Sequence, residues 1–538
     1  MTLAPRFLVN LWAGFRVSRY ARFLKSSGRG HAGQRKAFAQ LMGQIARTEF
    51  GVNHGLTPDT TYEQFRENVP PRTYDYYKPL VGRMAAGEPN VLVPGVCPFF
   101  VVTSGTTGTE PKLLPVPEAM LAHYRRGLRD TLYLYSLRTG HAGVFLGRHV
   151  HMGASTALIE ANGLYCASFD GILALSLSPW VEANLYAPPS AIAEMPESSD
   201  KVFAAARAMM HRDVTLVAGT PADVASLALA VREAASTGKR RMTHLQTVWP
   251  NLECFLFTGS TLGLFAEHLR SSLGPTVNFQ EMYAAAEGIF AAQCENINQG
   301  LRLLADNGVL FEFLPYQGYS EANLEKVGAQ CLPLEKVQIN TEYVLLVTTP
   351  AGLCRYVPGD IVRFLSLDPP RMQFAGRVGL ELNAFGEHVT ETELVDTIQT
   401  VCARNGWQAV SFHVAPYHHR LAAGQTINSH EWWVELRTHT TRTPTANLLG
   451  PELDAELAHR NPTYAAKRAC HGLDFPTVRL VVPGVFDQWA QGQNKAASTS
   501  KMARCRSDRL IADQLAELAR YHPATAAIFS PENLHAPA

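Results

Sequence analysis

The sequence contains no uninterrupted apolar run of the length that crosses a membrane, which is about 18 or more residues. An apolar stretch near the start, Phe7–Phe15, is broken by Asn10 and followed by Arg16, Arg19 and Arg22. No small-residue cleavage pattern follows, so we interpret the stretch as an amphipathic helix and not as a signal peptide. The sequence therefore predicts no membrane span.

An excess of charge of one sign is also missing. The chain has 48 Lys and Arg against 47 Asp and Glu, a formal net charge of +1. No overall field draws it to nucleic acid or to an anionic membrane. We expect no nucleic-acid partner, small-molecule substrates and a monomeric chain.

Cysteine is scarce and scattered. The nine cysteines are odd in number and form no C-x-x-C pair, which argues against a zinc site or a disulfide framework. A reducing compartment suits such a chain, so we expect it to be cytoplasmic. No internal repeat or low-complexity tract is present.

What the 538 residues do show is an α/β pattern. Thr215–Ala218 and Leu252–Phe257 read as buried strands, and each is followed by a Gly turn and a helix. We expect mostly parallel sheets whose loops at 103–112, 219–221 and 258–260 share one face, where ligands bind in such folds. The pattern changes near Gly379. We predict a large N-terminal domain over 1–378 and a smaller α+β C-terminal domain over 379–538.

The stretch Val101–Pro115 organises the rest. An apolar strand runs into a loop whose glycines allow a tight turn that brings backbone N–H groups towards an anion. Hydroxyls add donors and Lys112 adds a charge, as a polyphosphate requires; the alternative is an ordinary polar turn. The common phosphate loop, G-x-x-x-x-G-K-[ST], is absent. The predicted phosphate-binding residues are Thr103, Ser104, Gly105, Thr106, Thr107, Gly108 and Lys112.

Further along, Asn278–Gly288 contains Tyr283 and Glu287, which lie on one face if the segment is helical. Glu287 suits Mg²⁺, and the turn carboxylate of Asp360 suits the paired hydroxyls of a ribose. His149 and His151 alternate across a predicted strand and so share one face. No third metal ligand accompanies them, so we favour pocket lining or plain hydrogen bonding, with metal binding as the alternative.

These motifs, in this order, resemble the acyl-adenylate-forming superfamily: T-S-G-T-T-G…P-K, Y-x-x-x-E, a G-D turn and a G-R segment. The ten-residue loop from Thr103 to Lys112 is one residue longer than in acyl-CoA synthetases. With L-x-R-Y-x-x-G-D (353–360), F-G-E-H (385–388) and the ending from Lys501, it resembles the auxin-responsive acyl-acid amido synthetases and their bacterial relatives. The sequence departs from that pattern at Ala286, Cys354 and Ala503, which bears on rate and substrate more than on reaction class.

The resemblance implies a two-step ligase that uses ATP and Mg²⁺. A carboxylic acid is adenylated with release of pyrophosphate, and an amino acid amine then displaces AMP to give an amide. By resemblance, Tyr283 stacks on adenine, Glu287 holds Mg²⁺, and Asp360 with Arg377 binds the ribose. Gly259 and Ser260 edge the adenine, and His149 and His151 line the acid pocket. The catalytic residues are then Lys112, Glu287 and, from the C-terminal domain, Lys501, with Lys495 as the alternative lysine.

Two other functions share these motifs. An acyl-CoA ligase has the same first half-reaction, although the longer loop and the C-terminal ending argue against it. A non-catalytic nucleotide-binding protein could use the same scaffold, and the presence of Lys112, Glu287, Asp360 and a C-terminal Lys argues against that.

Overall fold

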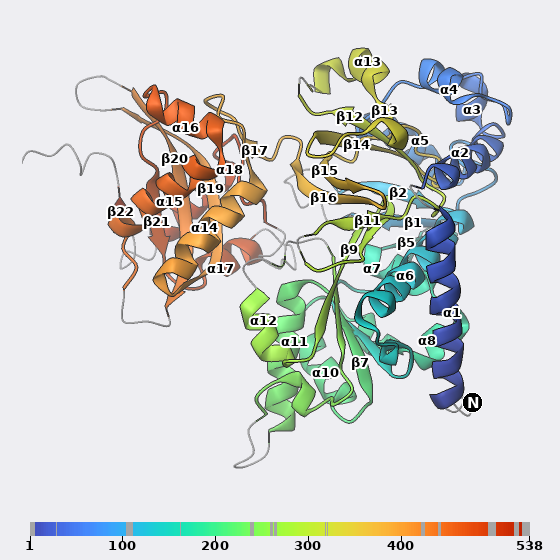
Figure 1. Ribbon diagram of the computed structural model, residues 1–538, viewed down its shortest axis with the longest axis horizontal. Helices are drawn as coiled ribbons and strands as arrows, with labels where there is room; N and C mark the ends of the chain where they lie inside the picture. The colour runs from blue at the N-terminus through green and yellow to red at the C-terminus, as the bar shows by residue number, and fades with distance from the viewer. Residues whose placement is uncertain are drawn as a thin grey trace, which may run out of the picture. The chain divides into compact units, whose positions relative to one another are not determined.

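The computed structural model divides into two compact units (Figure 1). The first contains the residues up to the 258–260 loop and His268–Phe374, and the second contains 261–267 and the chain from Ala375 on. The predicted division after residue 378 remains a prediction. The structure describes residues 6–27, 30–103, 111–161, 163–236, 242–258, 262, 266–297, 299–317, 319, 321–420, 426–438, 443–492, 502–520 and 527–529.

A 12-stranded sheet forms the centre of the first unit. Its strands, in spatial order, are β13 (Leu332–Pro333), β12 (Leu310–Pro315), β14 (Glu342–Thr348), β15 (Asp360–Leu367), β16 (Pro370–Arg377), β11 (Leu301–Leu303), β10 (Gly288–Gln293), β9 (Asn278–Ala285), β8 (Cys254–Phe257), β7 (Val214–Ala218), β3 (Arg148–His151) and β6 (Tyr186–Ala187). A separate sheet has the order β2 (Leu113–Val116), β1 (Phe99–Val102), β5 (Leu164–Ala167), β4 (Ile159–Ala161).

The predicted α/β class is confirmed, but the large sheet is mixed, so the expectation of mostly parallel strands is wrong. Neighbouring strands in the run β6, β3, β7, β8, β9 pair in parallel. The pairs β9–β10, β10–β11 and β11–β16 are antiparallel. So are the pairs β12–β14 and β14–β15. Parallel order is therefore limited to the part of the sheet where the sequence shows strand–turn–helix repeats. Short connections join β9 to β10 and β10 to β11, which antiparallel neighbours permit and parallel neighbours do not.

Helices pack around this sheet, with α6 against β9 and β10. They are α1 (Arg6–Ser27), α2 (His31–Ile45), α3 (Glu49–Asn53), α4 (Tyr62–Asn68), α5 (Tyr74–Ala85), α6 (Glu118–Thr139), α7 (Phe169–Ser176), α8 (Pro179–Asn184), α9 (Ser190–Ala193), α10 (Ser199–Met209), α11 (Pro221–Ala235), α12 (Ala266–Leu273) and α13 (Leu324–Val327). In the described chain, no helix is both long and apolar enough to cross a bilayer.

Local chemistry explains where these helices begin and end. Helix α4 begins at Tyr62, because Thr61 and Gln64 form a reciprocal capping box at its start. Helix α6 begins after Pro117 and ends at Thr139, where it is capped by Gly140, whose φ of 75° suits glycine.

The second unit is α+β, with strands β19 (Trp407–Arg420), β20 (Thr426–Thr438), β21 (Thr477–Val481) and β22 (Ala527–Phe529) side by side. Alternation along β20 sends Trp432 and Val434 to a core with α14 and α15, and Trp433 to a second core with α17 and α18. The remaining elements are β17 (Glu381–Leu382), β18 (Val389–Thr390), α14 (Glu391–Asn405), α15 (Ala446–Arg460), α16 (Pro462–Ala469), α17 (Val485–Gly492) and α18 (Leu510–Arg520).

Candidate functional site

The two ends of the predicted phosphate loop are held together. Strands β1 and β2 pair antiparallel with Val102 opposite Leu113. The Thr103 N–H donates to the Lys112 carbonyl (2.9 Å), and the Lys112 N–H donates to the Thr103 hydroxyl oxygen (3.0 Å). The residues Ser104, Gly105, Thr106, Thr107 and Gly108 lie outside the described residues. Thr103 and Lys112 therefore fix where that loop leaves and rejoins the sheet.

Lys112 is connected to Glu287 through a residue that sequence analysis did not assign to the site. The Lys112 ammonium donates to the Tyr356 hydroxyl (Nζ to Oη, 3.2 Å), which in turn donates to the Glu287 carboxylate (3.3 Å to Oε1). Lys112 Nζ also lies 5.6 Å from the Tyr74 ring centroid, within cation–π range. Tyr356 belongs to the L-x-R-Y-x-x-G-D motif, which was the signal that could have identified it.

Burial controls the protonation of this group. Tyr356 is completely buried and Glu287 is 8% exposed. Desolvation, and then the negative charge of Glu287, raise the pKa of Tyr356 well above its ordinary value. Tyr356 therefore stays protonated and donates to Glu287, leaving its oxygen to accept from Lys112.

The placement of Glu287 corrects one expectation. The segment 278–288 is not helical: β9 runs to Ala285 and β10 starts at Gly288, with Ala286 and Glu287 in the turn between them. Tyr283 and Glu287 therefore belong to one hairpin, and they do not share the face of a helix. Both strands contain apolar residues that favour the extended conformation, and every residue of β10 is buried.

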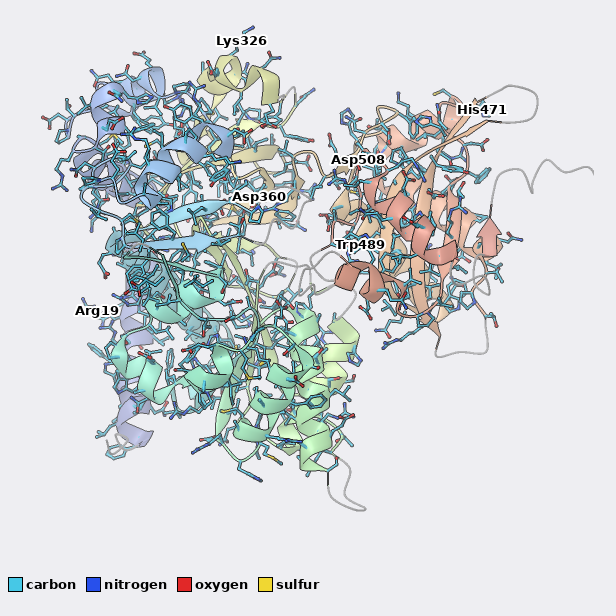
Figure 2. All side chains as sticks on the ribbon, turned by 180° about the vertical axis from the view of Figure 1, so that it is seen from behind. Arg19, Lys326, Asp360, His471, Trp489 and Asp508 are labelled. Carbon is cyan, nitrogen blue, oxygen red and sulfur yellow. The ribbon has the colours of Figure 1, made fainter. Side chains whose placement is uncertain are left out.

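Tyr283 and Asp360, which were assigned separately to adenine and ribose, contact each other. The Tyr283 hydroxyl donates to the Asp360 carboxylate. Asp360 is 2% exposed and opens β15 (Figure 2 labels it). The Tyr283 ring packs against Phe290 (centroids 5.3 Å apart) and Phe374 (6.4 Å). The predicted adenine and ribose roles of this pair remain predictions.

The other predicted residues divide into two groups. Arg377 ends β16 and belongs to the second unit. There, burial raises the pKa of Glu391, and the positive charges of Arg504 and then of Arg377 partly offset this rise. Gly259, Ser260, Lys495 and Lys501 lie outside the described residues.

A pocket lies beside the carboxyl ends of β3, β7 and β8, with about 700 Å³ of empty space that includes the open solvent at its mouth. His151, Gly219 and Thr258 line it, so two of the three predicted loops meet there. His149 is not among its described lining residues. Its ring lies 6.4 Å from that of His151 on the same face of β3, and its Nε2 lies 2.5 Å from the Val144 carbonyl oxygen. Burial lowers the pKa of His151 to about 3 and that of His149 to about 4, so both are neutral at pH 7.

The cavity wall is mostly apolar, with one buried cation. Lys201 is 3% exposed, and its ammonium donates to the carbonyls of Gly153, Ala154 and Ala193, each at 2.9 Å. All three N–H donors are thereby used, so Lys201 shapes the wall. The histidine pair has no metal-binding partner: the described residues contain no group of three His, Cys, Asp or Glu suited to a metal ion.

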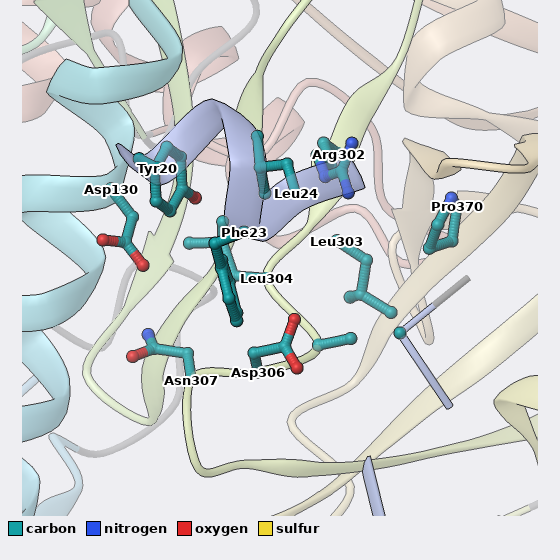
Figure 3. Close-up of a pocket in the computed structure, with 12 residues that line it drawn as sticks. Tyr20, Phe23, Leu24, Asp130, Arg302, Leu303, Leu304, Asp306, Asn307 and Pro370 are labelled. Atoms are coloured by element: carbon teal, nitrogen blue, oxygen red, sulfur yellow. The ribbon is translucent and has the colours of Figure 1, made fainter. Parts of the chain in front are cut away.

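A second pocket, open to solvent, lies under α1 (Figure 3). Tyr20, Phe23 and Leu24 of α1 line it together with Asp130 and Asn307. None of the predicted site residues lines it.

The fold places the chain in one structural class with solved acyl acid amido synthetase and acyl-CoA ligase structures. Solved structures of GH3.15 acyl acid amido synthetase superpose with TM-scores of 0.70 and, in complex with 2,4-DB, 0.73, at 16% identity, covering 93–95% of this chain and 95–96% of theirs. A 2-hydroxyisobutyryl-CoA ligase in the postadenylation state superposes with a TM-score of 0.55 at 16% identity, covering 92% of this chain and 91% of the ligase.

Within that class, the chain belongs to the GH3 family. Models of the GH3 family N-terminal, central and C-terminal domains match residues 19–235, 302–377 and 392–510. Indole-3-acetic acid-amido synthetase GH3.3 of Arabidopsis thaliana is 22% identical, over 88% of this chain and 89% of that protein. Indole-3-acetic acid-amido synthetase GH3.8 of Oryza sativa subsp. indica is 24% identical, over 88% of this chain and 87% of that protein. The predicted family is confirmed.

Proposed function

We propose that this protein is an ATP-dependent acyl-acid amido synthetase. It adenylates a small carboxylic acid and transfers the acyl group to the amine of an amino acid, releasing pyrophosphate and then AMP. The observation that carries the proposal is the pair of hydrogen bonds that links Lys112 to Tyr356 and Tyr356 to Glu287. They hold a cation and a carboxylate near the end of the predicted phosphate loop.

The residues of the first unit have distinct tasks in this reaction. A carboxylate is a poor electrophile, and linking it to AMP supplies a good leaving group. Lys112 stabilises negative charge on the phosphates as the acid oxygen attacks, and its hydrogen bond to buried Tyr356 holds the ammonium in place beforehand. The Tyr283–Asp360 pair binds the nucleoside, with the ring on adenine and the carboxylate on the ribose.

Glu287 fits a Mg²⁺ ion. A carboxylate oxygen is the ligand this ion prefers, and it is usually held by one or two carboxylates together with substrate phosphates. The bound ion supplies charge neutralisation at the phosphates. Glu287 offers the ion a carboxylate whose position is set by the Tyr356 hydroxyl.

The cavity at the ends of β3, β7 and β8 is the proposed acid site. Its mostly apolar wall suits the hydrocarbon part of an acid, and its polar groups include neutral His151, Thr156 and Asp170.

The test has two parts. ATP–pyrophosphate exchange is measured with a panel of aryl, indolyl and fatty acids; an acid-dependent exchange supports adenylation. The accepted acid is then supplied with each of the amino acids or with CoA. Amide formation with an amino acid supports the proposal, whereas thioester formation alone identifies an acyl-CoA ligase, and absence of exchange with every acid identifies a non-catalytic protein.

A further inference from the structure

Helix α1 lies along the outer edge of the first unit beside α6 and α8 and is attached by one side (Figure 1). Ala13, Val17 and Tyr20 on that side are buried. Arg16 donates to the Tyr133 hydroxyl (3.2 Å), and the Tyr20 and Tyr133 rings are 5.4 Å apart. These contacts fix which face of α1 points outward.

The outward face of the first half of α1 is apolar. At 3.6 residues per turn, its large side chains fall on one arc opposite Ala13, Val17 and Tyr20. Their exposed fractions are Phe7 64%, Leu8 47%, Leu11 67%, Trp12 49% and Phe15 59%. Trp180 of α8, 45% exposed, extends the patch, with its ring 6.3 Å from that of Trp12. A contiguous exposed patch of this kind marks an interaction site, whereas single exposed apolar residues do not.

The second half of the same arc is basic. Arg19 and Arg22 follow Phe15 by one and two helical turns, Lys25 follows them, and all three are exposed. Figure 2 shows Arg19 at the outer edge of the first unit. The sequence of α1 contains no Asp or Glu, and the neighbouring α8 has a single acidic residue, Glu182. This local positive charge contrasts with a whole-chain charge of only +1.

We propose that this face of α1 docks the protein on an anionic lipid bilayer, independently of the function proposed above. Phe, Trp and Leu enter the boundary between headgroups and acyl chains, and Arg19, Arg22 and Lys25 bind anionic headgroups. Charge favours this occupant over a second copy of the chain. A two-fold dimer through α1 would place the basic halves against each other if parallel, or against apolar side chains if antiparallel.

The experiment is flotation of the full chain with vesicles of phosphatidylcholine containing phosphatidylserine, compared with phosphatidylcholine alone. We expect binding that requires phosphatidylserine and weakens as salt is added. The double variant Arg19→Gln, Arg22→Gln should bind about thirtyfold more weakly, at about fivefold per lost basic side chain. The double variant Leu11→Ser, Phe15→Ser should bind these vesicles at least about tenfold more weakly than wild type does.

Matched controls lie elsewhere on the surface of the first unit. Arg207→Gln with Arg212→Gln tests the general effect of charge, and Phe203→Ser with Leu229→Ser tests that of exposed apolar residues. The control variants should bind as the wild type does. The proposal is overturned if no vesicle binds, if phosphatidylcholine alone binds equally well, if the controls weaken binding as much as the α1 variants do, or if the α1 variants bind like wild type. Self-association without lipid binding, abolished by Leu11→Ser with Phe15→Ser in light scattering, would assign the face to a second copy instead.

Discussion

At the scale of single residues, the hydroxyl of Tyr356 decides how Lys112 and Glu287 are arranged. A buried hydroxyl needs both a donor and an acceptor, and these two side chains supply them. Sequence analysis assigned each of the pair to phosphate chemistry from its motif alone. It could not show that a third residue joins them, because that depends on the approach of the turn before β15 to β2 and to the β9–β10 turn.

Glu287→Gln should abolish Mg²⁺-dependent adenylation without unfolding the chain. The amide retains the shape and can still accept from Tyr356, but it loses the charge that attracts the ion. ATP–pyrophosphate exchange measures the loss, and circular dichroism checks the fold. Glu295→Gln, an exposed carboxylate just past β10, is the matched control and should exchange normally. Normal exchange in Glu287→Gln would remove Glu287 as the metal ligand.

His151→Phe should change which acids are accepted without changing the apparent affinity for ATP. His151 lines the cavity and stacks on Tyr186, with ring centroids 5.2 Å apart. The measurement is exchange against the acid panel, with KM for ATP recorded in parallel. His149→Gln is the comparison, because His149 is not among the residues that line the cavity and should leave the acid ranking unchanged. An unaltered ranking in His151→Phe would count against this acid site.

At the scale of elements, the β9–β10 turn is held from behind by helix α6. The Ile289 N–H donates to His123 Nε2 (2.9 Å), whose Nδ1 lies 2.8 Å from the Asn307 carbonyl oxygen. The next residue of α6, Tyr124, donates to the Ala286 carbonyl. Neither was identified from sequence, since a His and a Tyr in a helix have no spacing that indicates a distant hairpin. Together they position the turn that carries Glu287.

His123 should make stability depend on pH. Burial lowers its pKa from 6.5 to about 4, so the unfolded chain takes up the proton first. Its contribution is complete above pH 6.5 and is lost as the pH falls through about 4, on the order of 3 kcal/mol. Denaturant unfolding at pH 6.5 and pH 4 should show a smaller loss in His123→Gln than in wild type. The exposed control His211→Gln should behave as wild type; an equal loss in all three would contradict this role.

Arg355 fixes the turn that presents Tyr356 and Asp360. Its side chain is 1% exposed; Nε contacts both oxygens of equally buried Glu312 (3.2 and 3.0 Å), and other nitrogens donate to the Val69 and Gly328 carbonyls. Arg355→Met should destabilise the chain by about 3–5 kcal/mol, because the buried charge of Glu312 would no longer have the Arg355 guanidinium beside it.

Thermal and denaturant unfolding measure the effect of Arg355→Met. Adding Glu312→Leu should recover part of the loss, since the buried charge is then gone. Arg35→Met, which removes the exposed partner of Glu335 (3.9 Å), is the control and should cost less than about 1 kcal/mol. A small effect of Arg355→Met would mean that the pair does not hold the turn.

At the scale of the whole molecule, the chain has two units, and the proposed reaction uses both. We expect Lys501, outside the described residues, to act only in adenylation, with the second unit turning about a hinge near Arg377–Glu381 before amide formation. Lys501→Ala should slow pyrophosphate exchange by roughly a hundredfold or more, the effect of one lost preorganised charge contact. Amide formation from supplied acyl-adenylate should be nearly unchanged.

The comparison for that test is Lys495→Ala, measured in both half-reactions. Equal losses of exchange and amide formation in Lys501→Ala, or a selective loss in Lys495→Ala, would show the assignment to be wrong. The monomeric state and the cytoplasmic location also remain predictions at this scale.

The sequence by itself determined the family and the α/β class, because these depend on local patterns: the Thr103–Lys112 loop, the L-x-R-Y-x-x-G-D motif and the strand–turn–helix repeats from Thr215 on. The tertiary structure alone decided that 278–288 is a hairpin, that Tyr283 bonds Asp360, that Tyr356 joins Lys112 to Glu287, and that His151, not His149, faces the cavity. The physical reason is that helical and strand spacing are properties of neighbours in sequence. Contacts between residues dozens to hundreds of positions apart depend on how the sheets pack.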